Sequence, residues 1–206
     1  IHETGRALFP GTGWATDIGG EAALGHAVNV SLPPGLSDSG WLRALHSVAM
    51  PVVRAFRPLV LVTQHGADTH FQDPLAHFAL SLDAQREAMV ALHRLSHEVC
   101  GGKWVALGGG GYEVIDVVRG AGTHLRATAA HRPSLPGTAV PQAWRDYVES
   151  LFGRPGPARM GDLPDGEPIW WRSWDLGYDP GNEVDRAVMA TRQAVFPLHG
   201  LDVWFD

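Results

Sequence analysis

The chain has 206 residues, of which 45% are hydrophobic and 18% charged; this is ordinary for a soluble globular domain and excludes a disordered or fibrous protein. A net charge of -6 excludes the basic surface that attracts nucleic acid or an anionic membrane, so we expect neither as a partner. The single cysteine, Cys100, excludes an internal disulfide framework, and no apolar run is long enough for a membrane helix or a signal peptide, so we expect a cytoplasmic protein.

Helix and strand patterns alternate along the first part of the chain. Apolar residues spaced along one face predict a helix over Trp41–Phe56, capped by Asp38 or Ser39 and kinked at Pro51. A continuously apolar run over residues 59–63 then predicts a strand that is buried on both faces.

The same alternation continues toward the middle of the chain. A helix is predicted over residues 83–100, a strand over 104–107 and a further helix from Glu113 to about Leu125. This order implies parallel strands joined by crossover helices, hence an α/β fold. The polar loops at 64–73 and 108–112 follow the carboxyl ends of the two strands, where such sheets bind ligands.

The last third of the chain differs in composition. Past His131, frequent proline and glycine predict an irregular tail that wraps on the core, with no second domain and no internal repeat. Its clustered tryptophans, Trp170, Trp171 and Trp174, are expected to pack against that core. A final helix is predicted over Asn182–Phe196, with Asn182 as its cap.

Asp68 and its neighbours raise the question of a metal. A carboxylate at a crevice needs a cation or hydrogen bonds to offset its desolvation, but an isolated aspartate after a strand more often caps a turn. His70 would share a face with Asp68 in an extended chain, which keeps an Asp-x-His metal pair open. Asp73, before Pro74, is interpreted as a turn or supporting residue.

Four glycines precede Tyr112. Such a run permits backbone angles and close approaches open to no other residue, so a chain or a substrate must come near. The loop lacks the lysine and hydroxyl of a P-loop and the spacing of a dinucleotide fingerprint, which disfavours nucleotide binding. The Tyr112 hydroxyl could hydrogen-bond a carbonyl oxygen as charge develops there, or could simply pack beside a tight turn.

Four blocks of sequence stand out in order and spacing: His2–Gly13 with its Phe-Pro-Gly-Thr-Gly, Asn29-Val30 with Leu32-Pro33, Gln64–Asp68 with Asp73–Leu75, and Gly108–Tyr112. Together they resemble the second half of the histone deacetylase family, most closely its bacterial acetoin-utilisation branch. The resemblance covers about residues 1–130, with 131–206 as a variable Pro- and Trp-rich C-terminal portion, and implies one layered αβα domain with a mainly parallel sheet.

The resemblance implies a role for individual residues. Asp68 would be the third protein ligand of a catalytic Zn²⁺, with Fe²⁺ possible and a structural monovalent cation elsewhere, and Tyr112 would polarise the acetyl carbonyl. The tunnel for the acyl-lysine stem would be lined by Phe9 and rimmed by Leu75, with Gly110 and Gly111 in its wall. His70 would then support the site or lie at the surface, because the family's Asp-x-His ligand pair comes from an earlier strand.

That earlier strand and the tandem catalytic histidines would precede Ile1. We therefore expect a fragment that binds zinc weakly and lacks deacetylase activity alone, since a catalytic zinc takes three protein ligands. The whole enzyme would hydrolyse N-acetyl-lysine in a protein such as acetyl-CoA synthetase. Alternatives are a related amidohydrolase acting on acetylpolyamines and a non-catalytic half-domain. The sequence is silent on oligomeric state.

Overall fold

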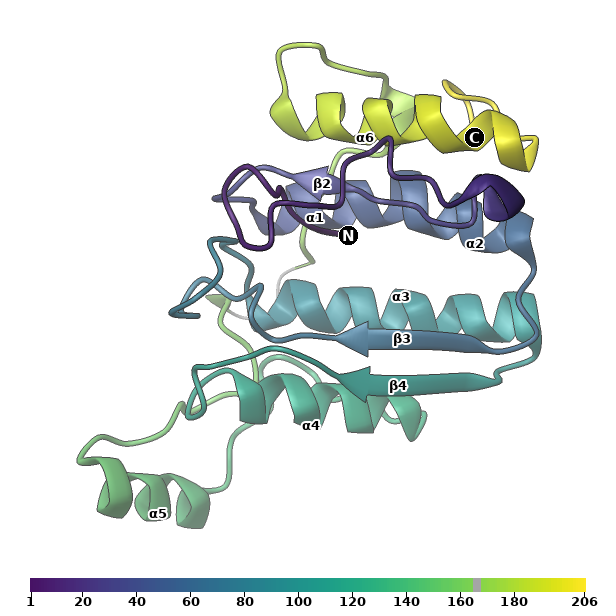
Figure 1. Cartoon of the computed structure of the whole chain (residues 1–206). Helices are drawn as coiled ribbons and strands as arrows, with labels where there is room; N and C mark the ends of the chain where they lie inside the picture. Colours follow the sequence, from purple (N-terminus) through teal and green to yellow (C-terminus); the bar gives the residue numbers. More distant parts are fainter. Residues whose placement is uncertain (165–167) are drawn as a thin grey trace.

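Helices and parallel strands are stacked in layers in the computed structural model, which describes residues 1–164 and 168–206 (Figure 1). β3 (Leu61–His65) pairs in parallel with β4 (Trp104–Gly108), with Leu61 opposite Trp104. β1 (His2–Glu3) pairs in parallel with β2 (Ser31–Leu32). The predicted α/β fold with parallel strands is confirmed, although the described strands form two separate pairs.

The first predicted helix is interrupted as its proline requires. α1 (Asp38–Ala44) continues through a π-helical turn, η2 (Leu45–Ala49), into α2 (Met50–Phe56). Pro51 has no N–H to donate to the carbonyl of Ser47 one turn back, and that carbonyl instead accepts a 2.6 Å hydrogen bond from Nη1 of the buried Arg192. The cap is Ser37 and not Asp38 or Ser39.

Two further helices flank β4 in sequence. α3 (Leu82–Cys100) matches its prediction closely, but its cap is Ser81, whose Oγ accepts from the backbone N–H of Ala84 at 3.1 Å. α4 (Val118–Ala129) begins five residues later than predicted. The Glu113 carboxylate accepts the backbone N–H groups of Asp116 and Val117, which holds the preceding segment in a turn.

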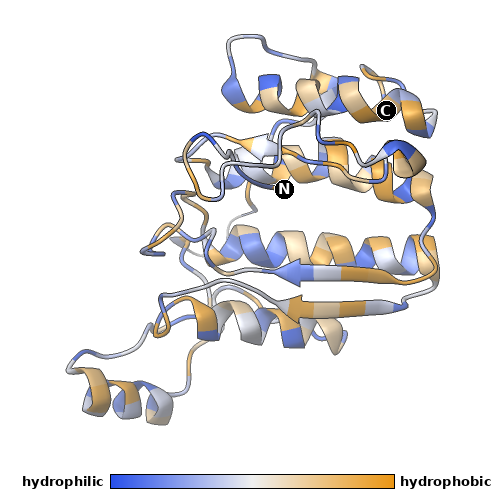
Figure 2. Cartoon of the chain, in the orientation of Figure 1, coloured by the Kyte–Doolittle hydropathy of each residue, from blue (hydrophilic) through white to orange (hydrophobic). Residues whose placement is uncertain are grey.

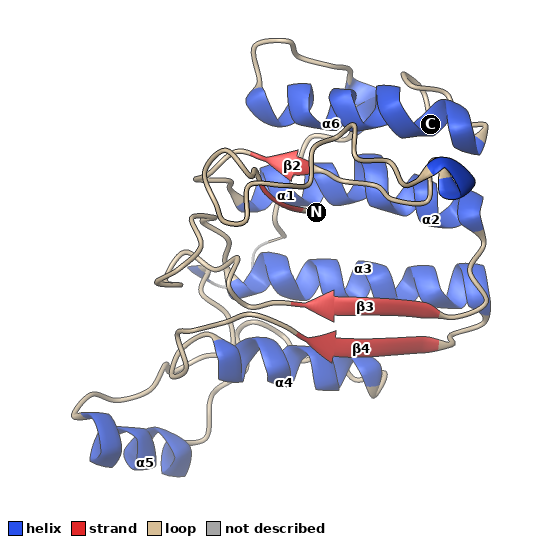
Figure 3. Cartoon of the chain, in the orientation of Figure 1, coloured by secondary structure: helices blue, strands red, loops and turns tan. Residues whose placement is uncertain are grey.

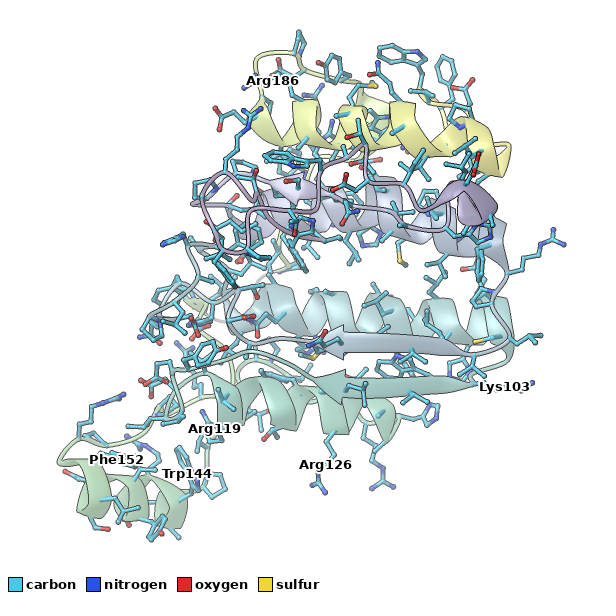
Figure 4. All side chains as sticks on the ribbon, in the orientation of Figure 1. Lys103, Arg119, Arg126, Trp144, Phe152 and Arg186 are labelled. Carbon is cyan, nitrogen blue, oxygen red and sulfur yellow. The ribbon has the colours of Figure 1, made fainter. Side chains whose placement is uncertain are left out.

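The irregular tail contains a helix that composition did not predict. α5 (Gln142–Phe152) lies between Pro141 and Pro155, so these prolines bound a helix instead of interrupting one. It contacts the body through Trp144, whose ring lies 4.5 Å from the Arg119 guanidinium carbon (Figure 4).

The predicted last helix is confirmed as α6 (Glu183–Val195), capped by the Asn182 side chain. Its Asp185 forms a buried ion pair with Arg43 of α1, and this guanidinium also donates to three backbone carbonyls, those of residues 172, 173 and 177. The pair fixes α6 and the preceding loop to α1.

The clustered tryptophans fulfil their prediction only in part. Trp174 is buried, with the guanidinium carbons of Arg43 and Arg192 at 4.8 and 4.6 Å from its ring. Trp171 stacks on His46, whereas Trp170 is exposed.

Three apolar clusters lie between successive layers. The largest joins α6 to α1, α2 and β2, the second joins α1 and α2 to α3, and the third joins α3 to α4. The helices α1, α2, α3, α4 and α6 therefore each bury apolar side chains against a neighbouring layer, and the apolar and polar residues of the helices can be followed in Figure 2.

β3 is covered on one face, not on both as predicted, and β4 is covered on the same face. Every second side chain of the two strands, beginning with Leu61 in β3 and Trp104 in β4, faces α3. On the opposite face, Val62, Val105 and Leu107 are exposed among the residues described. Loops gather where the arrows of β3 and β4 end (Figure 3), and the candidate site lies there.

Within the described residues, no helix combines the length and the apolarity that crossing a membrane would require.

Candidate active site

Asp68 lies in the loop that follows β3. Its carboxylate is partly buried in a pocket of about 290 Å³, together with His65, Thr69 and Gln85. Burial, and then the nearby negative charge of Asp73, raise the pKa of the Asp68 carboxyl above its ordinary value. Among the residues described, no other residue donates a hydrogen bond to this carboxylate, so a cation would be a favourable partner.

The glycines that follow β4 are needed because the loop containing Asp68 packs directly against them. A Cβ on Gly109 would lie 2.9 Å from the Cα of Gly66, and one on Gly110 would overlap the Asp68 carboxylate. Gly111 adopts a positive φ of 149°, which favours glycine. The backbone N–H of Ala67 donates to the carbonyl of Gly110 at 2.6 Å. The neighbour expected at this run is therefore another segment of the chain.

Asp73 connects the two loops a second time. Its Oδ1 accepts from the backbone N–H groups of Leu75 and Ala76, at 2.9 and 3.2 Å, in a local turn. Its Oδ2 accepts from the backbone N–H of Tyr112 at 2.9 Å, across 39 residues of chain. The buried Asp73 carboxylate thus fixes the backbone of Tyr112, while the Tyr112 side chain remains 52% exposed.

His65, at the end of β3, is held neutral. Burial lowers its pKa from 6.5 to about 4. Its Nε2 lies 2.7 Å from the Thr63 hydroxyl, and that hydroxyl accepts from the Trp104 indole N–H at 2.8 Å. These bonds orient the imidazole beside the Asp68 pocket.

His70 is not aimed at the pocket. It is fully buried, its Nε2 lies 2.9 Å from the Asp162 carboxylate, and its Nδ1 accepts the backbone N–H of Gln72 at 3.1 Å. The same Asp162 oxygen accepts from the backbone N–H of Leu82, the first residue of α3. Both imidazole nitrogens are occupied, so the Asp68–His70 metal pair is wrong, and His70 supports the loop from inside instead of lying at the surface.

The side chains expected to line a tunnel lie in separate loops. Phe9 is 93% exposed and Leu75 is 57% exposed. Gly110 and Gly111 sit directly against the Asp68 loop, as described above. Neither Phe9 nor Leu75 lines the pocket around Asp68, so their place in a tunnel stays a prediction.

A divalent metal fits Asp68 as one ligand. The carboxylate is partly buried, is unpaired among the residues described, and lies directly against Gly110, where any larger side chain would overlap it. Among the residues described, however, no three His, Cys, Asp or Glu side chains converge at this pocket. Since a catalytic zinc uses about three protein ligands, Asp68 alone does not complete such a site.

The sequence family described as "Histone deacetylase domain" matches residues 1–128, well over half of the chain. The chain belongs to the histone deacetylase family.

Similar histone deacetylase family proteins support this placement. The acetoin utilization protein AcuC of Bacillus subtilis is 39% identical over 192 residues, 93% of this chain and 49% of that protein. AcuC of Staphylococcus xylosus is 37% identical over 70% of this chain and 37% of its own length. The chain thus spans about half the length or less of these curated relatives.

Solved structures of this family share the fold. The crystal structure of a histone deacetylase homologue complexed with SAHA superposes with a TM-score of 0.71 at 25% identity, over 92% of this chain and 49% of that one. The HD domain of HDA15 superposes with a TM-score of 0.59 at 19% identity, over 97% of this chain and 44% of that one. The predicted deacetylase-like architecture is confirmed.

Two acidic residues of this histone deacetylase chain have partners that the sequence does not reveal. Asp73 is predicted to be a turn or supporting residue and does both: Oδ1 closes the local turn and Oδ2 accepts the backbone N–H of Tyr112. Asp162 was not singled out at all, although it binds His70 and the start of α3. An aspartate that accepts hydrogen bonds from two separate groups is visible only once the chain is folded, because its partners are distant in sequence.

Proposed function

We propose that the whole protein containing this chain is a zinc-dependent deacetylase of the acetoin-utilisation type that hydrolyses N-acetyl-lysine in proteins. One observation carries this proposal: the Asp68 carboxylate, unpaired in its pocket, and Tyr112 lie on two loops that are tied together by backbone contacts. The 39% identity to AcuC of Bacillus subtilis favours the acetoin-utilisation branch.

Asp68 would act as one metal ligand. The family is generally metal-dependent, and the described residues supply this one ligand in the pocket, so the remaining ligands would come from other parts of the protein. Zinc suits a site of carboxylate and imidazole ligands, and Fe²⁺ would accept the same set. When bound, the ion would supply Lewis-acid polarisation of the amide carbonyl and activation of a water molecule.

Tyr112 would act on the opposite side of the reacting carbonyl. As the amide carbon becomes tetrahedral, negative charge develops on its oxygen, and the phenol O–H would donate a hydrogen bond to it. The bond from its backbone N–H to Asp73 joins the Tyr112 loop to the Asp68 loop, while its exposed phenol would be free to meet the substrate. The products would be a free lysine amine and acetate.

The exposed side chains Phe9 and Leu75 would contact the acyl-lysine stem, with Gly110 and Gly111 in the wall of its channel. An acetylated metabolic enzyme such as acetyl-CoA synthetase would be a suitable protein substrate.

The deciding experiment uses Tyr112→Phe in the whole protein, assayed for release of acetate from an acetyl-lysine peptide and from an acetylpolyamine. We expect kcat on the peptide to fall on the order of a hundredfold. Tyr147→Phe is a matched control, because Tyr147 lies exposed on α5 and loses the same hydroxyl. An unchanged kcat in Tyr112→Phe would remove the tyrosine from the chemistry, and faster turnover of the polyamine would redirect the substrate assignment.

A further inference from the structure

Three histidines gather at the end of the molecule opposite the candidate active site. His93 and His97 lie one turn apart on the C-terminal half of α3, and His131 follows the end of α4. Figure 4 labels Lys103 near this end, just before β4 begins, whereas the Asp68 and Tyr112 loops follow the ends of β3 and β4. None of the three histidines belongs to the resemblance blocks or to the pocket around Asp68.

The ring nitrogens have the spacing of metal ligands. Nε2 of His93 and Nε2 of His97 lie 3.3 Å apart, and one ligand nitrogen from each of the three rings lies within 4.8 Å of the others. Two nitrogens bound to one tetrahedral zinc at ~2.0–2.1 Å are separated by about 3.3 Å. The first pair already has this separation, and His131 needs only a small side-chain movement to reach it.

The orientation of the rings also favours convergence on one point. The three ring planes are inclined to one another by 89°, 64° and 58°, with centroids 4.8 to 5.4 Å apart. Stacked imidazoles would present their faces to each other, whereas inclined rings can direct lone pairs toward a shared position. A pair of histidines four residues apart on a helix is a common metal-binding arrangement because both side chains lie on one face.

The surroundings of the cluster leave room for this geometry. A Cβ on Gly102 would lie 2.7 Å from the His97 ring, so glycine there permits the ring's position. His131 has a positive φ of 57°, which few non-glycine residues adopt, and this conformation brings its ring back over α3. His93 also packs beside Trp104, at 5.3 Å between ring centroids.

Among the residues described, the rings of the three histidines form no hydrogen bond other than the one between His93 and His97. His97 and His131 are exposed to solvent. Each ring therefore has a nitrogen that can be given to a metal.

We propose that His93, His97 and His131 form a second metal site, which binds one Zn²⁺ through three imidazoles with a fourth position open to water. Three neutral imidazoles suit zinc and the neighbouring transition metals, and not Mg²⁺ or Ca²⁺. The ion would fasten the C-terminal half of α3 to the turn after α4 and so reinforce the layer beside β4. This site is independent of the proposed function, since it shares no residue with the Asp68 pocket.

Titration of the metal-free protein with ZnCl₂ by calorimetry tests this proposal. Asp68→Asn is used as the common background so that zinc at the candidate active site does not contribute. Against that background, one zinc per chain should bind with micromolar affinity, and His97→Ala or His131→Ala should weaken it about tenfold or more. His26→Ala is the matched control, because His26 is an exposed histidine outside the cluster and its loss should leave the affinity unchanged.

The same samples give a second measurement. Zinc should raise the thermal unfolding midpoint in the Asp68→Asn background and in its His26→Ala derivative, but not when His97 or His131 is replaced, because a ligand stabilises only the state that binds it. Equal zinc affinity with and without His97 would overturn the site. Absence of zinc binding by the Asp68→Asn protein, in which all three histidines are intact, would do so as well.

Discussion

Replacement of Asp73 by asparagine should reveal how strongly the two active-site loops are coupled. Both Asp73 oxygens accept backbone N–H groups: Oδ1 accepts those of residues 75 and 76, and Oδ2 accepts that of Tyr112. Asparagine has one acceptor oxygen and one NH₂ group. If the oxygen keeps the local turn, the NH₂ faces the Tyr112 N–H, so a charge-assisted bond is replaced by two opposed donors.

The expected cost follows from this geometry. Loss of a hydrogen bond to a buried charge amounts to about 1.5–3 kcal/mol, and Asp73 is only 8% exposed. We therefore expect Asp73→Asn to lower the free energy of unfolding by about 2 kcal/mol or more in urea denaturation, and to speed hydrogen exchange at the Tyr112 amide.

Asp202→Asn provides the matched control for this experiment. Asp202 forms the same kind of turn, with Oδ1 accepting from the backbone N–H groups of Trp204 and Phe205, but it is exposed and its second oxygen has no recorded partner among the described residues. Asparagine should reproduce that turn at almost no cost. Equal destabilisation by the two substitutions would refute the idea that Asp73 joins the loops.

Other substitutions and conditions test further parts of the structure. Asp185→Asn should lower the free energy of unfolding by about 3–5 kcal/mol in urea, because Arg43 would be left buried without its partner, and a loss below about 1 kcal/mol would contradict this. The pKa of His65 is lowered to about 4 in the folded chain, so the unfolded chain binds a proton first as the pH falls below 6.5. The free energy of unfolding should therefore decline between about pH 6.5 and 4, by up to about 3 kcal/mol. His65→Gln should reduce this pH dependence when denaturation is measured across that range. Gly110→Ala should weaken metal binding at Asp68 in the whole protein, because its Cβ overlaps the carboxylate, and an unaltered metal content would argue against the proposed ligand.

Much of the element order could be predicted because it depends on local patterns. β3, α3, β4 and α6 are each signalled by apolar spacing or by a cap such as Asn182. The late start of α4 could not be predicted from the same signals, because Glu113 binds two backbone N–H groups and stabilises a turn in otherwise helix-compatible sequence.

The candidate site could likewise be predicted only in part. Asp68 and Tyr112 stand in short motifs that can be recognised from sequence, whereas the contacts that hold them join residues far apart. Asp73 reaches Tyr112 across 39 residues, and His70 reaches Asp162 across 92. Periodicity and composition carry no information about such pairs, so the burial and both hydrogen bonds of His70 emerge only from the folded chain.

The close approach of Gly109 to Gly66 has an evolutionary consequence. Two loops in backbone contact cannot change in sequence independently, since a bulkier residue or an insertion in one must be matched by a change in the other. Selection would therefore act on them as a single inherited block, while the peripheral segments, such as α5, are free to diversify. Sequence differences among relatives should accordingly lie outside these two loops, and the number of residues within each loop should stay the same.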